Sequence, residues 1–224
     1  MWTCSLLKTN ARRVLSRRYG ACLACVCAAL LVTAAPLCLL PAARAGLWVL
    51  GCAAVFAILF CIFIVSALRV GLRRFFLENR LGDAPTATLF SAFHAQGYAC
   101  IVRARLGRCL LVALWGLLLI VPGIVKAYET AMVDDLLAEN PQMPLRRALQ
   151  LSRRMTQGEK GRLFLLDLSF LGWWLLCALS AGAALPFFLP YRCAVRAEAY
   201  CALRAKAFAH GFTDARELGG FYRY

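Results

Sequence analysis

The sequence predicts an all-α fold, a polytopic integral membrane helical bundle with five to six membrane-inserted helices and short amphipathic surface helices. Of 224 residues, 62% are hydrophobic and the mean hydropathy is +0.68, which is too apolar for a soluble domain. The net charge of +15 comes from basic residues clustered between uncharged runs, a pattern typical of cytoplasmic loops. We therefore expect no nucleic-acid partner, although the charge alone would suit one.

The first two inserted segments are predicted at 19–43 and 45–68, after a basic cytoplasmic lead-in at residues 1–18. A signal peptide is the alternative for the first run, but its 25 uncharged residues exceed the roughly 7–15 apolar residues that such peptides use. The short connection around Pro41–Gly46 predicts an antiparallel membrane hairpin.

The central stretch is predicted to contribute segments 97–121 and 123–137, with Pro122 and Gly123 as a helix break or hairpin turn. If Pro122 only kinks one helix, 12 basic residues lie inside and 11 outside, which is no bias. If the chain turns back there, 22 of the 26 basic residues lie inside, as the positive-inside rule requires. The charge distribution favours the hairpin. Its second arm is short for a full crossing, so a tilted or partly crossing arm and a single kinked helix both stay open.

A basic surface helix is predicted at 144–157. Its apolar positions repeat at helical spacing, and the opposite face carries Arg146, Arg147, Arg153 and Arg154. Such a face can hold anionic lipid headgroups, each arginine contributing about 1 kcal/mol near the membrane. The alternative is a topology signal with no ligand.

The last two inserted segments are predicted at 163–180 and 184–203, with a turn near Gly182, followed by a cytoplasmic tail at 204–224. The single transmembrane domain is thus expected to cover 19–203, with both termini on the cytoplasmic side of the membrane.

The hairpin geometry predicts two structural ion pairs. Around residue 182, Asp167 is about level with Arg196, and an arginine can reach an otherwise unpaired carboxylate there. The same arithmetic around residue 122 brings Arg108 near Asp135 as a weaker candidate.

No catalytic or metal-binding motif is recognisable in the sequence. The chain lacks a nucleophile elbow, a zinc-protease motif, a P-loop and a dinucleotide-binding glycine motif, so we expect no catalysis and no cofactor. The 12 cysteines lie mostly in apolar runs, where a free cysteine behaves as a small hydrophobic residue, so we expect no metal.

Several motifs carry a resemblance to a known family. The runs VGLRRFFLENRLGDAPTATLFSAF, PGIVKAY, ENPQMPLRRALQLSRRMTQGEKGRLFLLDLSFLGWWLL and LPFFLPYRCAVRAEAY occur in this order within residues 60–203. This part resembles bacterial membrane proteins of domain-of-unknown-function family 975, which have no assigned activity. Glu129, Asp134 and Asp135 depart from the resemblance, because the family more often has uncharged residues there. A distant similarity to membrane domains fused to glycerophosphodiesterases implies lipid-related work, so a lipid-related enzyme is the one exception to a non-catalytic reading.

Two functional hypotheses follow. The first is a non-catalytic membrane protein that organises lipid or a membrane-protein partner through its basic cytoplasmic face. The second is a small-solute or ion transporter or channel, because five charged residues lie at membrane depth: Lys126, Glu129, Asp167, Arg192 and Arg196. Internal pairing and snorkelling are the simpler explanation of these charges.

Overall fold

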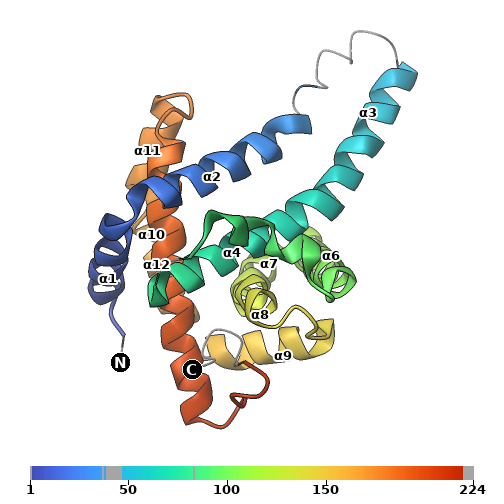
Figure 1. Ribbon diagram of the computed structural model, residues 1–224. Helices are drawn as coiled ribbons and strands as arrows, with labels where there is room; N and C mark the ends of the chain where they lie inside the picture. The colour runs from blue at the N-terminus through green and yellow to red at the C-terminus, as the bar shows by residue number, and fades with distance from the viewer. Residues whose placement is uncertain (1, 37, 39–46, 83, 219–224) are drawn as a thin grey trace.

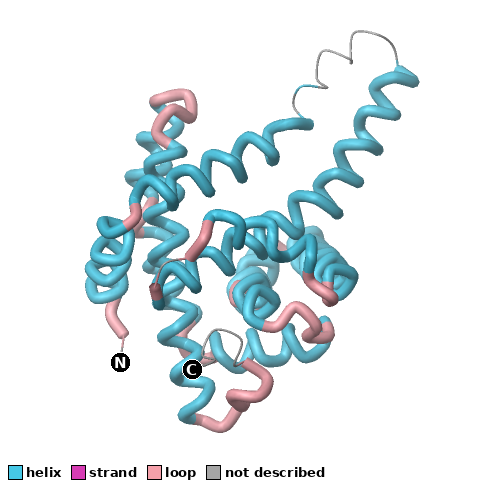
Figure 2. Tube along the Cα trace, viewed as in Figure 1, coloured by secondary structure: helices cyan, strands magenta, loops and turns pink. Residues whose placement is uncertain are grey.

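The computed structural model describes residues 2–36, 38, 47–82 and 84–218, and all regular elements in them are helices (Figures 1 and 2). The all-α fold class is thus confirmed. The number of membrane-inserted helices is a separate matter, because it depends on how long and how apolar each helix is.

The chain starts with α1, Cys4–Arg17, and α2, Tyr19–Ala34, which are bent by 96° relative to each other at Arg18. Thr3 caps α1 by accepting a hydrogen bond from the backbone N–H of Leu6. The buried face of α1 consists of Leu7, Ala11 and Leu15. The first predicted segment, 19–43, is helical through Ala34, and the predicted turn at 41–46 lies outside the described residues.

α3, Leu47–Phe60, a π-helical turn, Cys61–Val65, and α4, Ser66–Leu81, form one continuous helix. The segment predicted at 45–68 therefore extends to Leu81 instead of ending in a loop. The reason is that the second half of the helix buries an apolar face that includes Val70, Phe75, Phe76 and Leu77. The hydroxyl of Tyr98 donates to the Phe63 carbonyl inside the π-helical turn, at 3.2 Å.

After a 3₁₀ helix, Thr86–Phe90, and the short α5, Ser91–His94, the chain forms a helical hairpin. Its arms are α6, Tyr98–Leu118, and α7, Ile120–Glu129. They lie side by side and are seen almost end-on in Figure 1.

This hairpin turns at Leu119, whose backbone is extended (φ −157°, ψ 139°). The turn therefore comes three residues before the predicted position. Pro122 fits within the first turn of α7, where its missing N–H costs no helical hydrogen bond. Gly123 faces α6 instead of forming the turn.

The second arm predicted at 123–137 is divided. After α7 ends at Glu129, α8, Val133–Glu139, begins, and all seven of its residues are buried. α8 packs against α4, α6 and α9. Its apolar residues belong to the protein core, which differs from the prediction of a continuous inserted arm.

α9, Leu145–Thr156, is the predicted basic amphipathic helix. Pro144 precedes its first residue, and Gly158, with φ +78°, follows its end. The side chain of Leu145 packs on Gly107 of α6, where an added Cβ would lie 2.4 Å from Leu145 Cδ2. The inner face of α9 consists of Ala148, Leu151, Ser152, Met155 and Thr156.

The chain then rises through α10, Lys160–Leu168, and α11, Leu171–Leu179, and turns back into α12, Leu185–Ala209. The turn uses Ala181 (φ 48°) and Gly182 (φ 91°), as the sequence predicts. α12 continues past the predicted end at residue 203, and Pro190 lies inside it without ending it.

α12 is the central helix of the molecule: it contacts α1, α2, α4 and α9. In Figure 1, the α11–α12 turn and the far ends of α2 and α3 lie in the upper half of the view. The start of α1, the end of α12 and the whole of α9 lie in the lower half. The basic helix α9 and the end of α12 thus lie at the opposite end of the molecule from the α11–α12 turn.

Candidate functional site

Buried ion pairs hold α8 against its neighbours. Asp134 lies 2.9 Å from Arg108 Nη1 and 3.6 Å from Arg105 Nη1, both on α6. Asp135 lies 3.7 Å from Arg73 Nη1 of α4. Buried charges are retained only when they are paired, so the two carboxylates specify where α8 docks.

The predicted Arg108–Asp135 pair is therefore wrong in its acidic partner, because Arg108 pairs with Asp134. The cause is the position of the hairpin turn. With the turn at Leu119, Arg108 faces residue 130, and its Nε donates to Thr130 Oγ1 at 3.3 Å. Two of the three departures from the family pattern, Asp134 and Asp135, thus have a structural role in this chain.

Asp167 forms the second ionic cluster, between α10 and α12. Arg196 Nη2 donates to both oxygens of Asp167, at 2.8 and 3.1 Å, so the structure brings together the two residues paired from the sequence. Arg192 Nη2 lies 3.7 Å from Asp167, and the Tyr128 hydroxyl donates to it at 3.2 Å. One carboxylate is therefore shared by three side chains from two elements.

The remaining charges that the sequence predicts at membrane depth are also paired. Glu129 accepts from Lys126 Nζ at 2.7 Å and from Lys160 Nζ at 2.5 Å. Every member of the set that suggested transport is thus engaged in a contact within the protein. Their arrangement is that of a structural network.

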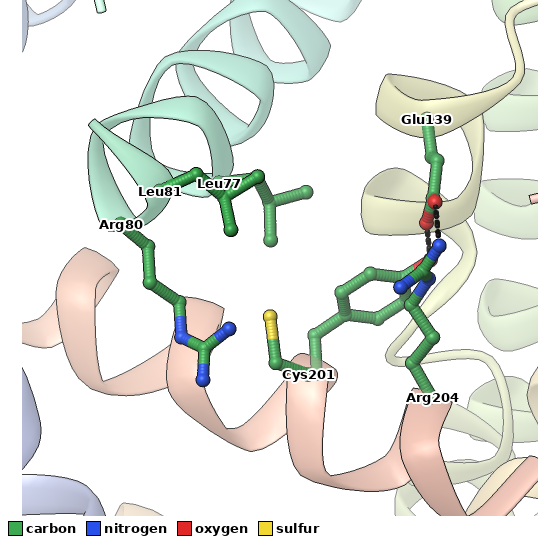
Figure 3. Close-up of a pocket in the computed structure, with 7 residues that line it drawn as sticks. Leu77, Arg80, Leu81, Glu139, Cys201 and Arg204 are labelled. Carbon is green, nitrogen blue, oxygen red and sulfur yellow. Dashed lines mark hydrogen bonds and ion pairs between the residues drawn. The ribbon is translucent and has the colours of Figure 1, made fainter. Parts of the chain in front are cut away.

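A small pocket lies between α4, α8 and α12 (Figure 3). Glu139 pairs there with Arg204 at 2.6 Å and accepts a hydrogen bond from Tyr200 at 2.6 Å. Burial raises the pKa of Glu139, although both partners favour its charged form. Arg80 lies on the other side of Cys201 from Arg204, and its Nε is 2.7 Å from Glu198. The sequence did not single out this pocket, since its residues come from three distant segments.

The four arginines predicted to contact lipid on α9 divide into two groups. Arg146, Arg153 and Arg154 are exposed. Arg147 is half-buried and donates from Nε and Nη2 to both oxygens of Glu217, at 2.7 Å each, and from Nη2 to the Phe212 carbonyl. Arg147 therefore holds the C-terminal segment, and only its three neighbours are presented to the surroundings.

The exposed charge is almost entirely positive. Among the described residues, Asp214 is the one exposed acidic residue. The exposed basic residues are Arg12, Arg13, Arg17, Arg69, Arg103, Arg146, Arg153, Arg154 and Arg216. Because the other described acidic residues are at least partly buried and ion-paired, the excess of basic residues falls on the surface.

The cysteines offer no alternative site in the described part of the chain. All twelve, from Cys4 to Cys201, are free thiols. No group of three or more His, Cys, Asp or Glu residues there has a geometry that could hold a metal ion.

Two described helices are long and apolar enough to cross a membrane, Trp48–Leu81 and Lys160–Leu179. α1 and α2 together would be a third, if the bent pair is one span. α6 is too highly charged to be a candidate span, because three arginines lie in its first half. α7 is too short, because it has only 10 residues. The count of five to six is thus not confirmed.

An all-helical chain with two or three such helices and an excess of surface arginine is compatible with an integral membrane protein. The family model described as "protein of unknown function (DUF975)" matches residues 37–207. The chain belongs to this family, as the sequence motifs indicated. No curated protein and no solved structure is matched by the chain.

Proposed function

We propose that this protein is a non-catalytic, multi-pass protein of the bacterial cytoplasmic membrane that binds anionic lipid headgroups through exposed arginines on its cytoplasmic face. Both termini and α9 lie on that face in this proposal. The observation that carries it is the charge of the exposed surface. Among the described residues, nine arginines are exposed, but only one acidic residue, Asp214, is exposed. A surface of that kind attracts phosphate headgroups.

The position of α9 supports a contact with lipid. Leu145 packs on Gly107, only three residues before Leu110, an exposed residue in the uncharged part of α6. Further along α9, Ser152 Oγ donates to the Glu129 carbonyl at 2.7 Å, near the base of α7. α9 is thus held beside the hairpin at the level where charged residues give way to apolar ones, which is the level of lipid headgroups.

Transport of a small solute or ion is the second candidate. It is motivated by charges within the apolar segments, but Lys126, Glu129, Asp167, Arg192 and Arg196 all have partners inside the protein. We rank transport lower for this reason. Flux into proteoliposomes that depends on Asp167 would reverse the ranking.

The proposal is tested by replacing Arg146, Arg153 and Arg154 together with glutamine. At about 1 kcal/mol per arginine near the membrane, the affinity for phosphatidylglycerol should fall more than tenfold. Native mass spectrometry of the detergent-solubilised protein, titrated with phosphatidylglycerol or phosphatidylcholine, measures the effect. A charge-matched comparison replaces Arg12, Arg13 and Arg17 of α1 on the same face, and a smaller loss in this variant shows how much of the effect is specific to α9. Unchanged affinity in the α9 variant would contradict a lipid-binding α9.

A further inference from the structure

The α6–α7 hairpin is closed by a direct contact between backbones. A Cβ added to Gly123 would lie 2.6 Å from the Cα of Gly116 and 3.0 Å from its N. The arms can approach so closely only because position 123 has no side chain. At the base of the hairpin, Arg108 Nε of α6 donates to Thr130 Oγ1, which directly follows α7.

The tip of this hairpin is exposed and apolar. Leu117 is 89% exposed and Ile120 76% exposed, although both are large hydrophobic residues. The same surface continues over Leu110, Leu114, Leu118, Leu119, Val121, Ile124 and Val125. A contiguous apolar surface of this kind requires an apolar environment.

Charged residues mark where this apolar surface ends on both arms. Arg108 bounds it on α6 and Lys126 on α7, and no charged residue lies between them. Lys126 Nζ lies 5.4 Å from the centre of the Trp115 ring, and tryptophan is enriched at membrane interfaces. Arg108 is held in place by Asp134. Both boundaries are therefore built into the folded core.

The length of the arms determines how deep the tip can reach. The uncharged part of α7, residues 120–125, has 6 residues, which corresponds to about 9 Å at 1.5 Å per residue. The uncharged end of α6, from Cys109 to Leu118, has 10 residues, which corresponds to about 15 Å. A hydrocarbon layer is about 30 Å thick, so the arms cover about a third to a half of it and neither arm can cross it.

We propose that the α6–α7 hairpin enters a single leaflet from the cytoplasmic side, with its tip among the acyl chains of that leaflet and both arms returning to the same surface. The occupant of its apolar surface is then the acyl chains of that leaflet. This inference rests on the proposed membrane location of the protein. It explains why α8 and α9 follow the hairpin at the level of its base.

Depth measurements test the proposal. Spin labels are placed on single cysteines, Leu110→Cys, Leu114→Cys, Leu118→Cys, Val121→Cys and Val125→Cys, in a cysteine-free background reconstituted into liposomes. The ratio of oxygen to nickel-chelate accessibility should rise to a maximum at 118–121 and fall on both sides. A depth that keeps changing in one direction from 110 to 125 would overturn the one-leaflet hairpin.

A reference position separates this inference from the proposed function. Val55 is 58% exposed on α3, within one of the two candidate spans. A deep Val55→Cys label with shallow or polar-exposed tip labels would overturn the hairpin proposal alone. A shallow label at Val55 as well would overturn the proposed membrane location. If removal of the native cysteines lowers the yield, Leu118→Trp in the native background gives a second readout, through quenching by brominated lipids.

The two glycines at the contact provide a matched pair of variants. An added Cβ at Gly123 meets the Gly116 backbone, whereas an added Cβ at Gly116 meets nothing within 4 Å. Gly123→Ala should therefore lengthen the distance between spin labels at positions 114 and 124, and Gly116→Ala should leave it unchanged. Equal distances in both variants would show that the close backbone contact is absent.

Discussion

At the scale of single residues, Asp167 is the one carboxylate facing two arginines of α12, Arg192 and Arg196. Removing Arg196 leaves Asp167 with Arg192 and Tyr128 as partners. Removing Asp167 leaves two like charges one helical turn apart with no acid between them. The two substitutions should therefore differ in cost, although they break the same ion pair.

We expect Asp167→Asn to lower the thermal stability of the detergent-solubilised protein more than Arg196→Gln does. Both side chains are about three-quarters buried, so the larger loss should be on the order of 1–3 kcal/mol. The double variant should recover part of the loss of Asp167→Asn, because it removes one of the two facing charges. Unfolding followed by size-exclusion chromatography after heating measures all three. Additive losses would contradict coupling between the two residues.

The contrast between the two predicted ion pairs shows how far the sequence can place side chains. The Asp167–Arg196 contact could be found because the turn at Ala181 and Gly182 has a recognisable small-residue signal. The Arg108 partner was misplaced because the extended residue is Leu119, which carries no turn signal at all. Residues that face each other across a hairpin can be paired from the sequence only when the position of the turn is known.

At the scale of elements, the C-terminal segment is fastened to α9 by Glu217. Arg147 donates two hydrogen bonds to this carboxylate, and Thr213 donates a third at 2.9 Å. The Asn140 side chain donates to the Glu217 carbonyl, and Leu218 is fully buried behind it. Arg147 thus stabilises the contact between α9 and the C-terminal segment.

Glu217→Gln should loosen this segment and speed up trypsin cleavage after Arg216 several-fold. The neutral amide keeps an acceptor but loses the charge that strengthens both hydrogen bonds from Arg147. Asp214→Asn is the matched control, because Asp214 is exposed and close in sequence. Equal cleavage rates in the two variants would mean that Glu217 does not hold the segment.

The same contact predicts a dependence on pH. The hydrogen bonds from Arg147 lower the pKa of Glu217 below its ordinary value. Its stabilising contribution is therefore complete at neutral pH and is lost as the pH falls through the lowered pKa. Amide exchange at residues 212–218, corrected for intrinsic rates, should become faster relative to α12 in acid. In Glu217→Gln this acid-dependent change should be absent.

Two elements could not be assigned from the sequence for different reasons. α1 has a recognisable signal, since Leu7, Ala11 and Leu15 are spaced four apart behind Thr3, but the basic charge of residues 1–18 concealed it. α8 has no such signal, because Asp134, Asp135 and Glu139 are buried acids whose partners come from other helices. Tertiary pairing of this kind overrides local patterning.

At the scale of the whole molecule, the path of the chain between the ends of α9 and α11 decides the topology. Gln157 is exposed just after α9, and Ala183 is exposed in the turn before α12. The helix Lys160–Leu179 lies between them and is long and apolar enough to cross a membrane. If it does so, the two positions lie on opposite sides.

The distribution of basic residues decides which side is which. In the proposed topology, in which the chain turns back at Leu119, residues 138–162 are on the same side as the loop after α4, and 22 of the 26 basic residues are inside. In a cysteine-free background, Gln157→Cys should therefore react with an impermeant maleimide only after the cells are permeabilised. Ala183→Cys should react in intact cells. Labelling of both positions from outside would mean that Lys160–Leu179 does not cross the membrane, and an exchange of the two patterns would place α9 on the outer face.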